Sequence, residues 1–396
     1  MVKSIIFSVI IISLMVQQFW IISSPIVLKP YMLVIVGTIP FFLFNMNRKI
    51  NFPGSFLILF TLMIYLVSTS FLVDDISLSF NRTLGLLLLF TLIFYLFIYG
   101  DESKFNKRII LKFLLVYSCL SLSYYLVGLI ASMKVEGYLE GFERGIYGLY
   151  LDGILPRYRG FLDSPNNAVI ILFMILMYSL MDSSKLGNLL SFLTLLLILI
   201  TFSFTGYIAV TFLILGYVLS RGIKAISASL LLVLFTIFLL LHFYLHDSTF
   251  SMLVDARVER LSTGSGRFEL FSHSIELISN APISGHGLAQ ARLLLEGFQG
   301  RDLQSTHNSF IEVFLEGGFL AITLYLLFWT MLFIDAIKSK VCWKSRVILF
   351  SYLVSLFVLN NSNNLFYVEL MIFGLFWFYW VKRQLENDTY HQYCLN

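Results

Sequence analysis

Long apolar runs recur along the whole chain, and they constrain its fold more than any other feature. About twelve of them approach or exceed the ~20 residues that a helix needs to cross a bilayer. They lie at residues 4–21, 29–46, 54–72, 83–100, 109–132, 166–181, 188–203, 205–220, 226–245, 308–334, 347–360 and 365–381. Only 13% of the residues are charged, whereas a soluble domain has about 25%. The sequence therefore predicts an all-α polytopic membrane protein, with residues 1–396 forming a single integral-membrane domain.

The basic residues predict the orientation of the chain. If both termini are cytoplasmic, the short connections obey the positive-inside rule. We therefore place both termini in the cytoplasm and the two long connections, 133–165 and 246–306, on the outer side. The first apolar run follows a basic residue, as in a signal peptide, but no small-x-small cleavage site precedes Pro25. We interpret this run as an uncleaved first span.

The type of cation differs between the two predicted sides. Predicted inner segments carry mostly lysine, whereas the predicted outer segments carry Lys29, Lys134 and a larger set of arginines. These arginines are Arg82, Arg144, Arg157, Arg159, Arg257, Arg260, Arg267, Arg292 and Arg301. A guanidinium group holds phosphate through a planar donor fork and keeps its charge when half buried. The pattern indicates a phosphorylated ligand on the outer side. The alternative is pairing with outer carboxylates or contact with anionic lipid.

Both long connections are predicted to contain amphipathic helices, and the second shows local order. Gly264 and Gly266 precede Arg267 and would expose backbone N–H groups to an anion at a helix N-terminus. Apolar residues then recur at helical spacing, until Asn280 and Pro282 stop the helix. The predicted apolar face is Phe268, Phe271, Ile275 and Ile278. A Gly-His-Gly turn at 285–287 leads to a second amphipathic piece at 288–298.

The stretch STHNSFIEVFLEGGFLA, residues 305–321, begins at the outer mouth of a predicted span. A helix that begins near Thr306 or Asn308 directs the positive end of its dipole toward His307. This favours neutral imidazole, which can act as a base.

Two glutamates follow in the same helix. At about 100° per residue, Asn308, Glu312 and Glu316 form one stripe that runs into the bilayer. His307 is predicted to stack over Ile311, Phe314 and Gly318. Carboxylates inside a span normally face a polar interior, so the stripe predicts a polar site at the outer end of this span.

Three elements resemble the signature of the O-antigen ligase and polymerase superfamily. HNSFIEVFLEGGFLA matches its His-Asn pair and Glu-x-Gly turn at His307, Asn308, Glu316 and Gly318, with Ala321 where glycine is commoner. GSGRFELFSHSIELISNAPISGHG is similar to an arginine entering a helix that ends in Pro-x-x-Gly-x-Gly, here Arg267, Pro282, Gly285 and Gly287. RGFLDSPNNAV resembles an earlier element at Arg159, Pro165 and Asn166. Many members have a Ser-Arg pair where this chain has Ser203 and Phe204, so the role of that arginine is absent or supplied elsewhere.

The resemblance implies an integral-membrane glycosyltransferase of the GT-C type in lipopolysaccharide biosynthesis. Such enzymes use glycans linked to undecaprenyl pyrophosphate at the periplasmic face of the bacterial inner membrane, which makes the outer loops periplasmic. A glycosyl pyrophosphate is already a good leaving group. Catalysis therefore needs cations for the departing phosphates and a base for the attacking hydroxyl.

We assign the catalytic roles to His307 as the base and to Arg159 and Arg267 as the phosphate-holding cations. The candidate substrate-binding residues are Arg157, Arg144, Asn166, Asn308, Glu316, Arg292 and Arg301. The outer segments contain no Asp-x-Asp pair, so we expect a metal-independent enzyme without a cofactor.

Two acceptors fit this chemistry. An O-antigen polymerase transfers the growing glycan to a lipid-linked repeat unit, and an O-antigen ligase transfers it to lipid A-core. We favour the polymerase because the first long loop, rich in arginine and tyrosine, suits a second polyprenyl-linked substrate. A polysaccharide transporter or lipid flippase is less favoured, because the glutamates in spans lie near the outer end. The expected partners are membrane lipid, a chain-length regulator and a flippase, with no nucleic acid.

Overall fold

The computed structural model of the chain describes residues 2–17, 29–45, 52–73, 76–100, 107–132, 145–152, 155–222, 244–245, 251, 255, 267–296, 305–362 and 365–387. Within these ranges, the side chains of residues 2–4, 41–45, 72, 152, 155, 267–268 and 362 lie outside the description. The predicted site residues Arg144 and Arg301 fall outside the described residues, as does nearly all of the apolar run 226–245.

Apolar helices dominate the described part of the chain. The first half contains α1 (Val2–Met15), α2 (Pro30–Asn45), α3 (Gly54–Thr69), the short 3-10 helix η1 (Ser70–Leu72), α4 (Ile76–Gly100), α5 (Lys107–Ser132), α6 (Pro165–Leu180), α7 (Lys185–Ile200) and α8 (Phe204–Arg221). The second half contains α11 (Arg267–Asn280), α12 (Gln290–Leu294), α13 (Ser309–Ile337), α14 (Trp343–Ser362) and α15 (Glu369–Asn387). Each predicted run other than 226–245 coincides with one of these helices.

Four helices in the described ranges are long and apolar enough to cross a membrane: Ile76–Gly100, Lys107–Ser132, Phe204–Arg221 and Ser309–Ile337. Shorter apolar helices accompany them. The prediction of a helical membrane protein is therefore confirmed, while the number of about twelve spans stays a prediction.

A short polar break separates α7 from α8. Ser203 caps α8 through its hydroxyl oxygen, which accepts a hydrogen bond from the Gly206 N–H at 3.3 Å. Phe202 lies just before the cap in a left-handed conformation, with φ 48°. The cap satisfies a backbone donor that the helix itself leaves free, so the sequence TFSFTGY ends one helix and begins the next.

Helices α6 and α15 lie at the centre of the bundle. α15 is buried from Glu369 to Val381, and α6 is buried from Ala168 to Leu180. α15 packs against α1, α4, α6 and α14. A helix that is apolar on all sides requires such surroundings.

The described part of the first long connection forms a small sheet before α6, where amphipathic helices are predicted, and this corrects the prediction for residues 145–152 and 155–158. β1 (Gly145–Ile146), β2 (Leu149–Asp152) and β3 (Leu155–Tyr158) pair as a three-stranded antiparallel sheet in the order β1-β2-β3. Tyr147 has φ 49° in the tight turn between β1 and β2. The sheet is held against α5, where the Tyr125 hydroxyl donates to the Pro156 carbonyl at 2.9 Å. The strands satisfy backbone groups that an irregular loop packed against the bundle would leave unpaired.

The second long connection contains the predicted amphipathic helix. α11 ends at Asn280 as expected, but the face it buries is Leu270, Ser274 and Ile278, while Ile275 is 61% exposed. α11 packs against α13. The predicted apolar face is therefore rotated about the helix axis relative to the face that is buried. Tertiary packing against α13, and not apolar spacing alone, selects the buried side.

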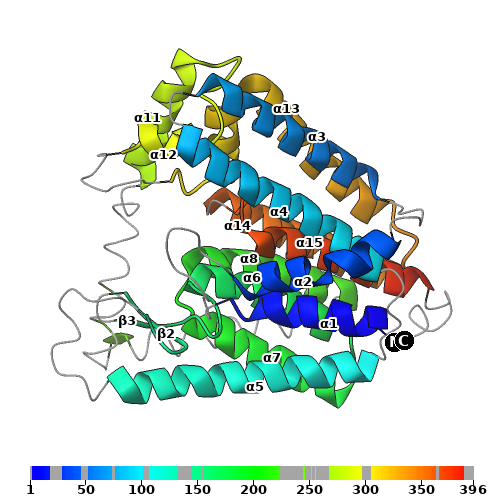
Figure 1. The fold of residues 1–396 in the computed structure, drawn as a ribbon. Helices are drawn as coiled ribbons and strands as arrows, with labels where there is room; N and C mark the ends of the chain where they lie inside the picture. The colour runs from blue at the N-terminus through cyan, green and yellow to red at the C-terminus, as the bar shows by residue number, and fades with distance from the viewer. Residues whose placement is uncertain are drawn as a thin grey trace.

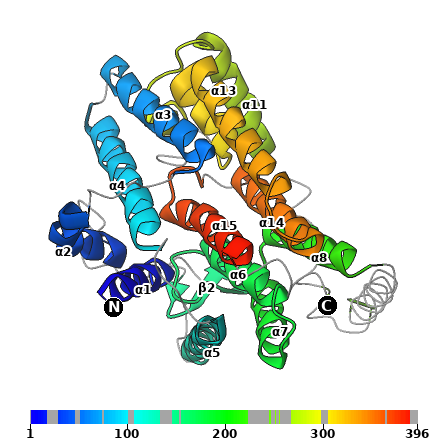
Figure 2. The same cartoon turned by 90° about the vertical axis from the view of Figure 1, so that its right-hand side faces the viewer.

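Both long connections lie at the same end of the bundle. Figure 1 shows strands β2 and β3 at this end together with α11 and α12, whereas the start of α1 and the end of α15 lie at the opposite end. Figure 2 views the bundle from that opposite side, with α11 next to α13 and β2 below α15. The arrangement agrees with two long loops on one side of a membrane.

Candidate functional site

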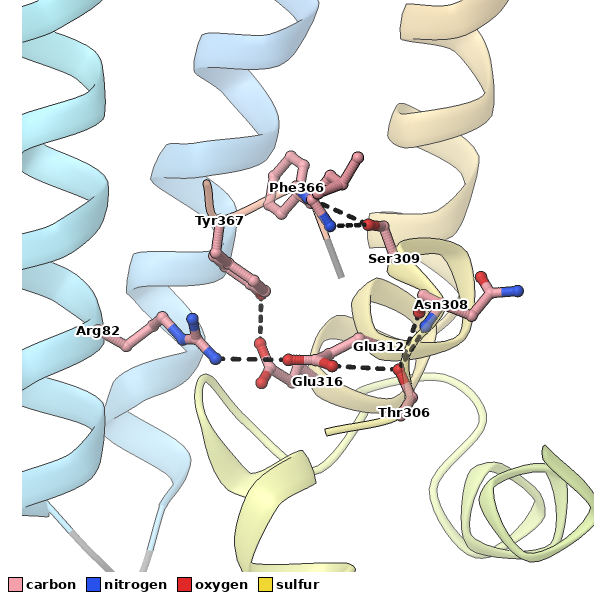
Figure 3. Close-up of polar contacts among 9 residues, drawn as sticks. Arg82, Thr306, Asn308, Ser309, Glu312, Glu316, Phe366 and Tyr367 are labelled. Carbon is pink, nitrogen blue, oxygen red and sulfur yellow. Dashed lines mark hydrogen bonds and ion pairs between the residues drawn. The ribbon is translucent and has the colours of Figure 1, made fainter. Parts of the chain in front are cut away.

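The N-terminal end of α13 is anchored by two polar side chains. The side-chain oxygen of Asn308 caps the helix and accepts hydrogen bonds from Phe310 N at 2.9 Å and Ile311 N at 3.3 Å. The Ser309 hydroxyl oxygen accepts from the backbone N–H groups of Leu365 at 2.9 Å and Phe366 at 3.0 Å (Figure 3). The helix thus begins one residue after Asn308, and its first turn holds the segment that precedes α15.

Glu312 and Glu316 follow on successive turns, and neither side chain is exposed. Glu312 Oε1 lies 3.3 Å from Nη2 of Arg82 on α4, and the Tyr367 hydroxyl donates to Glu316 (Figure 3). The Arg82 guanidinium also lies over the Tyr367 ring, 4.0 Å from its centroid. The two glutamates face the protein interior, as predicted, and join α4, α13 and the turn before α15. We call Arg82, Glu312, Glu316 and Tyr367 the carboxylate cluster.

His307 lies immediately outside α13, with the left-handed φ of 52°. It sits in a turn closed by Thr306, whose Oγ is 2.8 Å from the Asn308 carbonyl and 3.1 Å from Glu312 Oε2. Because His307 is not helical, the predicted stacking over the helix residues below it is wrong. Non-glycine residues in this conformation are strained by about 1–3 kcal/mol and cluster at functional sites. Thr306 connects this strained residue to the carboxylate cluster.

A kink in α13 brings together two sequence elements, the Pro-x-x-Gly-x-Gly turn and the Glu-x-Gly turn. Gly318 has φ 64° and ψ −159° inside the helix. The carbonyls of Leu315 and Glu316 accept hydrogen bonds from the N–H groups of His286 and Gly287, each at 2.8 Å. The Phe319 N–H donates to the Pro282 carbonyl at 2.9 Å. The Pro-x-x-Gly-x-Gly turn therefore replaces the helical partners that the kink removes.

Glycine is required on both sides of this contact. A Cβ atom on Gly318 would collide with the Ile283 carbonyl, and one on Gly285 would come within 2.5 Å of the Glu316 carbonyl oxygen. Gly285 also has a positive φ of 69°. Only glycine allows the two backbones to approach this closely in these conformations.

Arg157 and Asn166 contact the junction between α7 and α8. The Arg157 Nε donates to the Thr201 carbonyl at 2.9 Å, and this arginine is only 9% exposed. The Asn166 side-chain oxygen accepts from the Ser203 hydroxyl at 3.0 Å. These contacts tie the sheet and the start of α6 to the cap of α8, which gives both residues a structural role besides the substrate-binding role predicted for them.

Arg159 follows β3 directly and packs across the sheet. Its Nε donates to the Tyr147 carbonyl at 3.0 Å. Tyr124 of α5 forms an aromatic group with Tyr147 and Phe161, at centroid distances of 5.6 Å and 5.1 Å. Arg267 is the first residue of α11, but its side chain is not described. The sharing of one ligand by Arg159 and Arg267 stays a prediction.

A second ion pair lies at the starts of α2 and α15. Lys29 Nζ is 2.5 Å from Glu369 Oε1 and 3.7 Å from Asp163 Oδ2. Burial lowers the pKa of Lys29, but the carboxylates of Glu369 and Asp163 outweigh burial, so the pKa is raised overall. The ammonium group therefore stays charged and holds three segments together at this end of the bundle.

Residues 189–326 match the model of a family described as O-antigen ligase. This segment is therefore similar to the O-antigen ligase family. Members of this family are glycosyltransferase-like enzymes. A comparison with curated proteins gives no match.

The matched segment includes both elements that meet at the α13 kink, which confirms the resemblance to the ligase and polymerase superfamily. The third element, at 159–169, precedes the matched segment.

Arg82 is the main functional candidate that the sequence analysis missed, although it was counted among the outer arginines. It lies outside the matched segment and pairs with Glu312 inside it. The available signal was an arginine in a helix that is otherwise long and apolar, since such residues normally face a partner or a cavity. Among the described residues, no group of three or more His, Cys, Asp or Glu side chains is suited to a metal ion.

Proposed function

We propose that the chain is an O-antigen polymerase at the periplasmic face of the bacterial inner membrane. It transfers a glycan chain from undecaprenyl pyrophosphate to a lipid-linked repeat unit. The observation that carries the proposal is the carboxylate cluster beside His307, whose two glutamates lie inside the segment that matches the O-antigen ligase family. It supports chemistry on a charged substrate at this end of the bundle.

The proposed reaction forms one C–O bond and breaks another. His307 takes the proton from the attacking sugar hydroxyl, and the resulting oxygen attacks the anomeric carbon of the donor. The bond from that carbon to the pyrophosphate breaks, and the electron pair leaves with the diphosphate. Arg159 and Arg267 stabilise the departing charge. The strained backbone of His307, held by Thr306, supports a fixed position for the base.

The polymerase is favoured over the ligase because of the sheet in the first long connection. The Tyr147 side chain is 47% exposed at the turn of this sheet, next to Tyr124. An exposed aromatic side chain near a guanidinium group suits a sugar and its phosphate. This surface supports a second polyprenyl-linked substrate.

The alternative is an O-antigen ligase, whose acceptor is lipid A-core. The surface glycan of a deletion strain separates the two functions. Loss of a polymerase leaves one repeat unit on the core, whereas loss of a ligase leaves bare core and accumulated lipid-linked polymer. An unchanged glycan in the deletion strain contradicts both.

Arg267→Lys is expected to impair transfer, although the positive charge is kept. Lysine is a point charge and cannot hold phosphate through a planar fork. We expect the rate of glycan transfer to fall roughly ten-fold or more, which corresponds to the loss of one charged hydrogen bond. Polymer formation by purified variant and wild-type protein measures the effect. Full activity of Arg267→Lys favours a role in salt bridges instead.

Transfer is expected to persist in the presence of a chelator, because the proposed cations are all guanidinium groups. The same transfer reaction with EDTA checks this expectation. Activity that EDTA abolishes and an added divalent metal restores contradicts metal independence.

A further inference from the structure

The first part of α13, residues 309–317, is folded back against the rest of the helix. The ring centroids of Phe310 and Tyr325 are 4.8 Å apart, whereas the same separation in sequence along a straight helix spans about 22 Å. Gly318, with φ 64° and ψ −159°, makes the turn between the two parts. We call residues 309–317 the initial segment. The body of α13 does not fix the direction of this segment, so contacts with other elements decide where its N-terminal end lies.

Glu312 anchors the initial segment to α4. Its side chain is fully buried, and its Oε1 lies 3.3 Å from Nη2 of Arg82. The Arg82 guanidinium is itself held over the Tyr367 ring, 4.0 Å from the centroid. A buried carboxylate is costly without its partner, so the ion pair fixes the place of the initial segment on α4.

Thr306 extends this anchor to the turn that contains His307. Thr306 is fully buried, and its Oγ lies 3.1 Å from Glu312 Oε2 and 2.8 Å from the Asn308 carbonyl oxygen. The Asn308 N–H donates to the same Oγ at 3.3 Å. The hydroxyl therefore bridges the residues on both sides of His307 and contacts the carboxylate that Arg82 holds (Figure 3). A left-handed residue such as His307 persists only where its surroundings hold it.

We propose that Arg82, Glu312 and Thr306 are positioning residues for His307. Arg82 holds the Glu312 carboxylate, the carboxylate and the Thr306 hydroxyl hold the turn, and the turn fixes the imidazole relative to the attacking sugar hydroxyl. The three residues act through His307 and not on the substrate. The inference rests on the proposed function, because it takes His307 as the base. A base that acts in the chemical step affects kcat, whereas KM should stay nearly constant.

The first test compares two substitutions of Thr306. Thr306→Val removes the hydroxyl and keeps the branched shape, whereas Thr306→Ser keeps the hydroxyl. We expect kcat for glycan transfer to fall about ten-fold or more in Thr306→Val with KM nearly unchanged, because a displacement of about 1 Å can cost 10²-fold. Thr306→Ser should retain the wild-type kcat. Thermal unfolding checks each variant, and Thr306→Ala removes the same hydroxyl from a smaller side chain if valine does not fold.

The second test reports on His307 without transfer. Diethyl pyrocarbonate modifies imidazoles, and mass spectrometry measures its rate at His307 relative to His273 of the same molecule. His273 lies on α11 with 33% of its side chain exposed, so it serves as the internal reference. A turn released from Glu312 opens more often. The rate ratio should therefore rise in Thr306→Val and stay at the wild-type value in Thr306→Ser.

The third test asks whether the three residues act as one chain. The double variant Arg82→Gln/Glu312→Gln removes both charges together, so that neither is left buried without its partner. It should also lower kcat. Adding Thr306→Val to it should lower kcat by no more than about two-fold further, because residues of one network are not additive. Fully multiplied losses contradict the chain.

Thr330→Val is the matched control. Thr330 is an exposed threonine of α13 beyond the kink, and its hydroxyl donates to the Leu326 carbonyl at 2.8 Å. It contacts no member of the chain in the described part of the protein, so Thr330→Val should keep the wild-type kcat and the wild-type rate ratio.

A folded Thr306→Val with wild-type kcat and rate ratio overturns the proposal, and so does an equal loss of kcat in Thr306→Ser. The outcome is separable from that of the proposed function. If wild-type protein transfers no glycan but the ratio rises only in Thr306→Val, the positioning stands and the polymerase fails. If wild-type protein transfers glycan and Thr306→Val matches it in both measurements, the polymerase stands and the positioning fails.

Discussion

Gly318→Ala should leave little folded protein in the membrane. The backbone conformation of Gly318, φ 64° and ψ −159°, is one that only glycine adopts readily. A methyl group there would also collide with the Ile283 carbonyl and push the Pro-x-x-Gly-x-Gly turn away from α13. Strain, collision and the lost backbone hydrogen bonds together should cost about 4 kcal/mol or more. The yield of monodisperse protein in detergent and its thermal unfolding midpoint measure the loss.

Gly37→Ala is the control for this prediction. Gly37 is a helical glycine in open space, so alanine there should be neutral or stabilise the helix by up to about 1 kcal/mol. Gly285→Ala tests the same contact from its other side, where the added Cβ would lie 2.5 Å from the Glu316 carbonyl oxygen. If Gly318→Ala and Gly285→Ala both unfold at the wild-type temperature, the turn does not support the kink.

His307→Ala should lower glycan transfer by roughly 10²–10⁴-fold, which is the usual contribution of a general base. The side chain lies outside α13 and is only partly buried. Its removal should therefore leave folding intact, and alanine keeps the N-cap at Asn308 available. The initial rate of polymer formation at saturating donor measures the effect, with thermal unfolding as the check on folding.

His273→Ala is the matched control for His307→Ala. His273 lies on α11 beside Glu276, with its Nδ1 3.6 Å from the carboxylate, and has no part in the proposed reaction. Its removal should leave the rate within about two-fold of wild type, as expected for a surface substitution. Near-normal transfer by folded His307→Ala would refute the assignment of the base.

The helices could be predicted from the sequence because their signal is local. Apolar runs set by bilayer thickness correspond to described helices from α1 to α15. The start of α13 was also predictable, since Asn308 is a preferred N-cap residue and the apolar run follows it directly. The inward direction of Glu312 and Glu316 followed from the cost of exposing carboxylates to lipid.

Other features depend on contacts between distant segments. The sheet at residues 145–158 is held by Tyr125 and Ser121 of α5, and no local pattern indicates those partners. The pairing of Arg82 with Glu312 joins residues 230 positions apart. The conformation of His307 depends on the turn made by Thr306. The prediction extended the α13 helix back to His307 and therefore gave this residue the wrong position.

The most direct test of the account is polymer formation by purified protein in liposomes. The protein is supplied with a defined repeat unit on undecaprenyl diphosphate, and the lipid-linked products are separated by size. Wild-type protein should produce a ladder of lengthened glycans and release undecaprenyl diphosphate, whereas His307→Ala should leave single repeat units. A wild-type reaction that contains only single repeat units, or an undiminished ladder from His307→Ala, would contradict the proposed transfer at the end of α13.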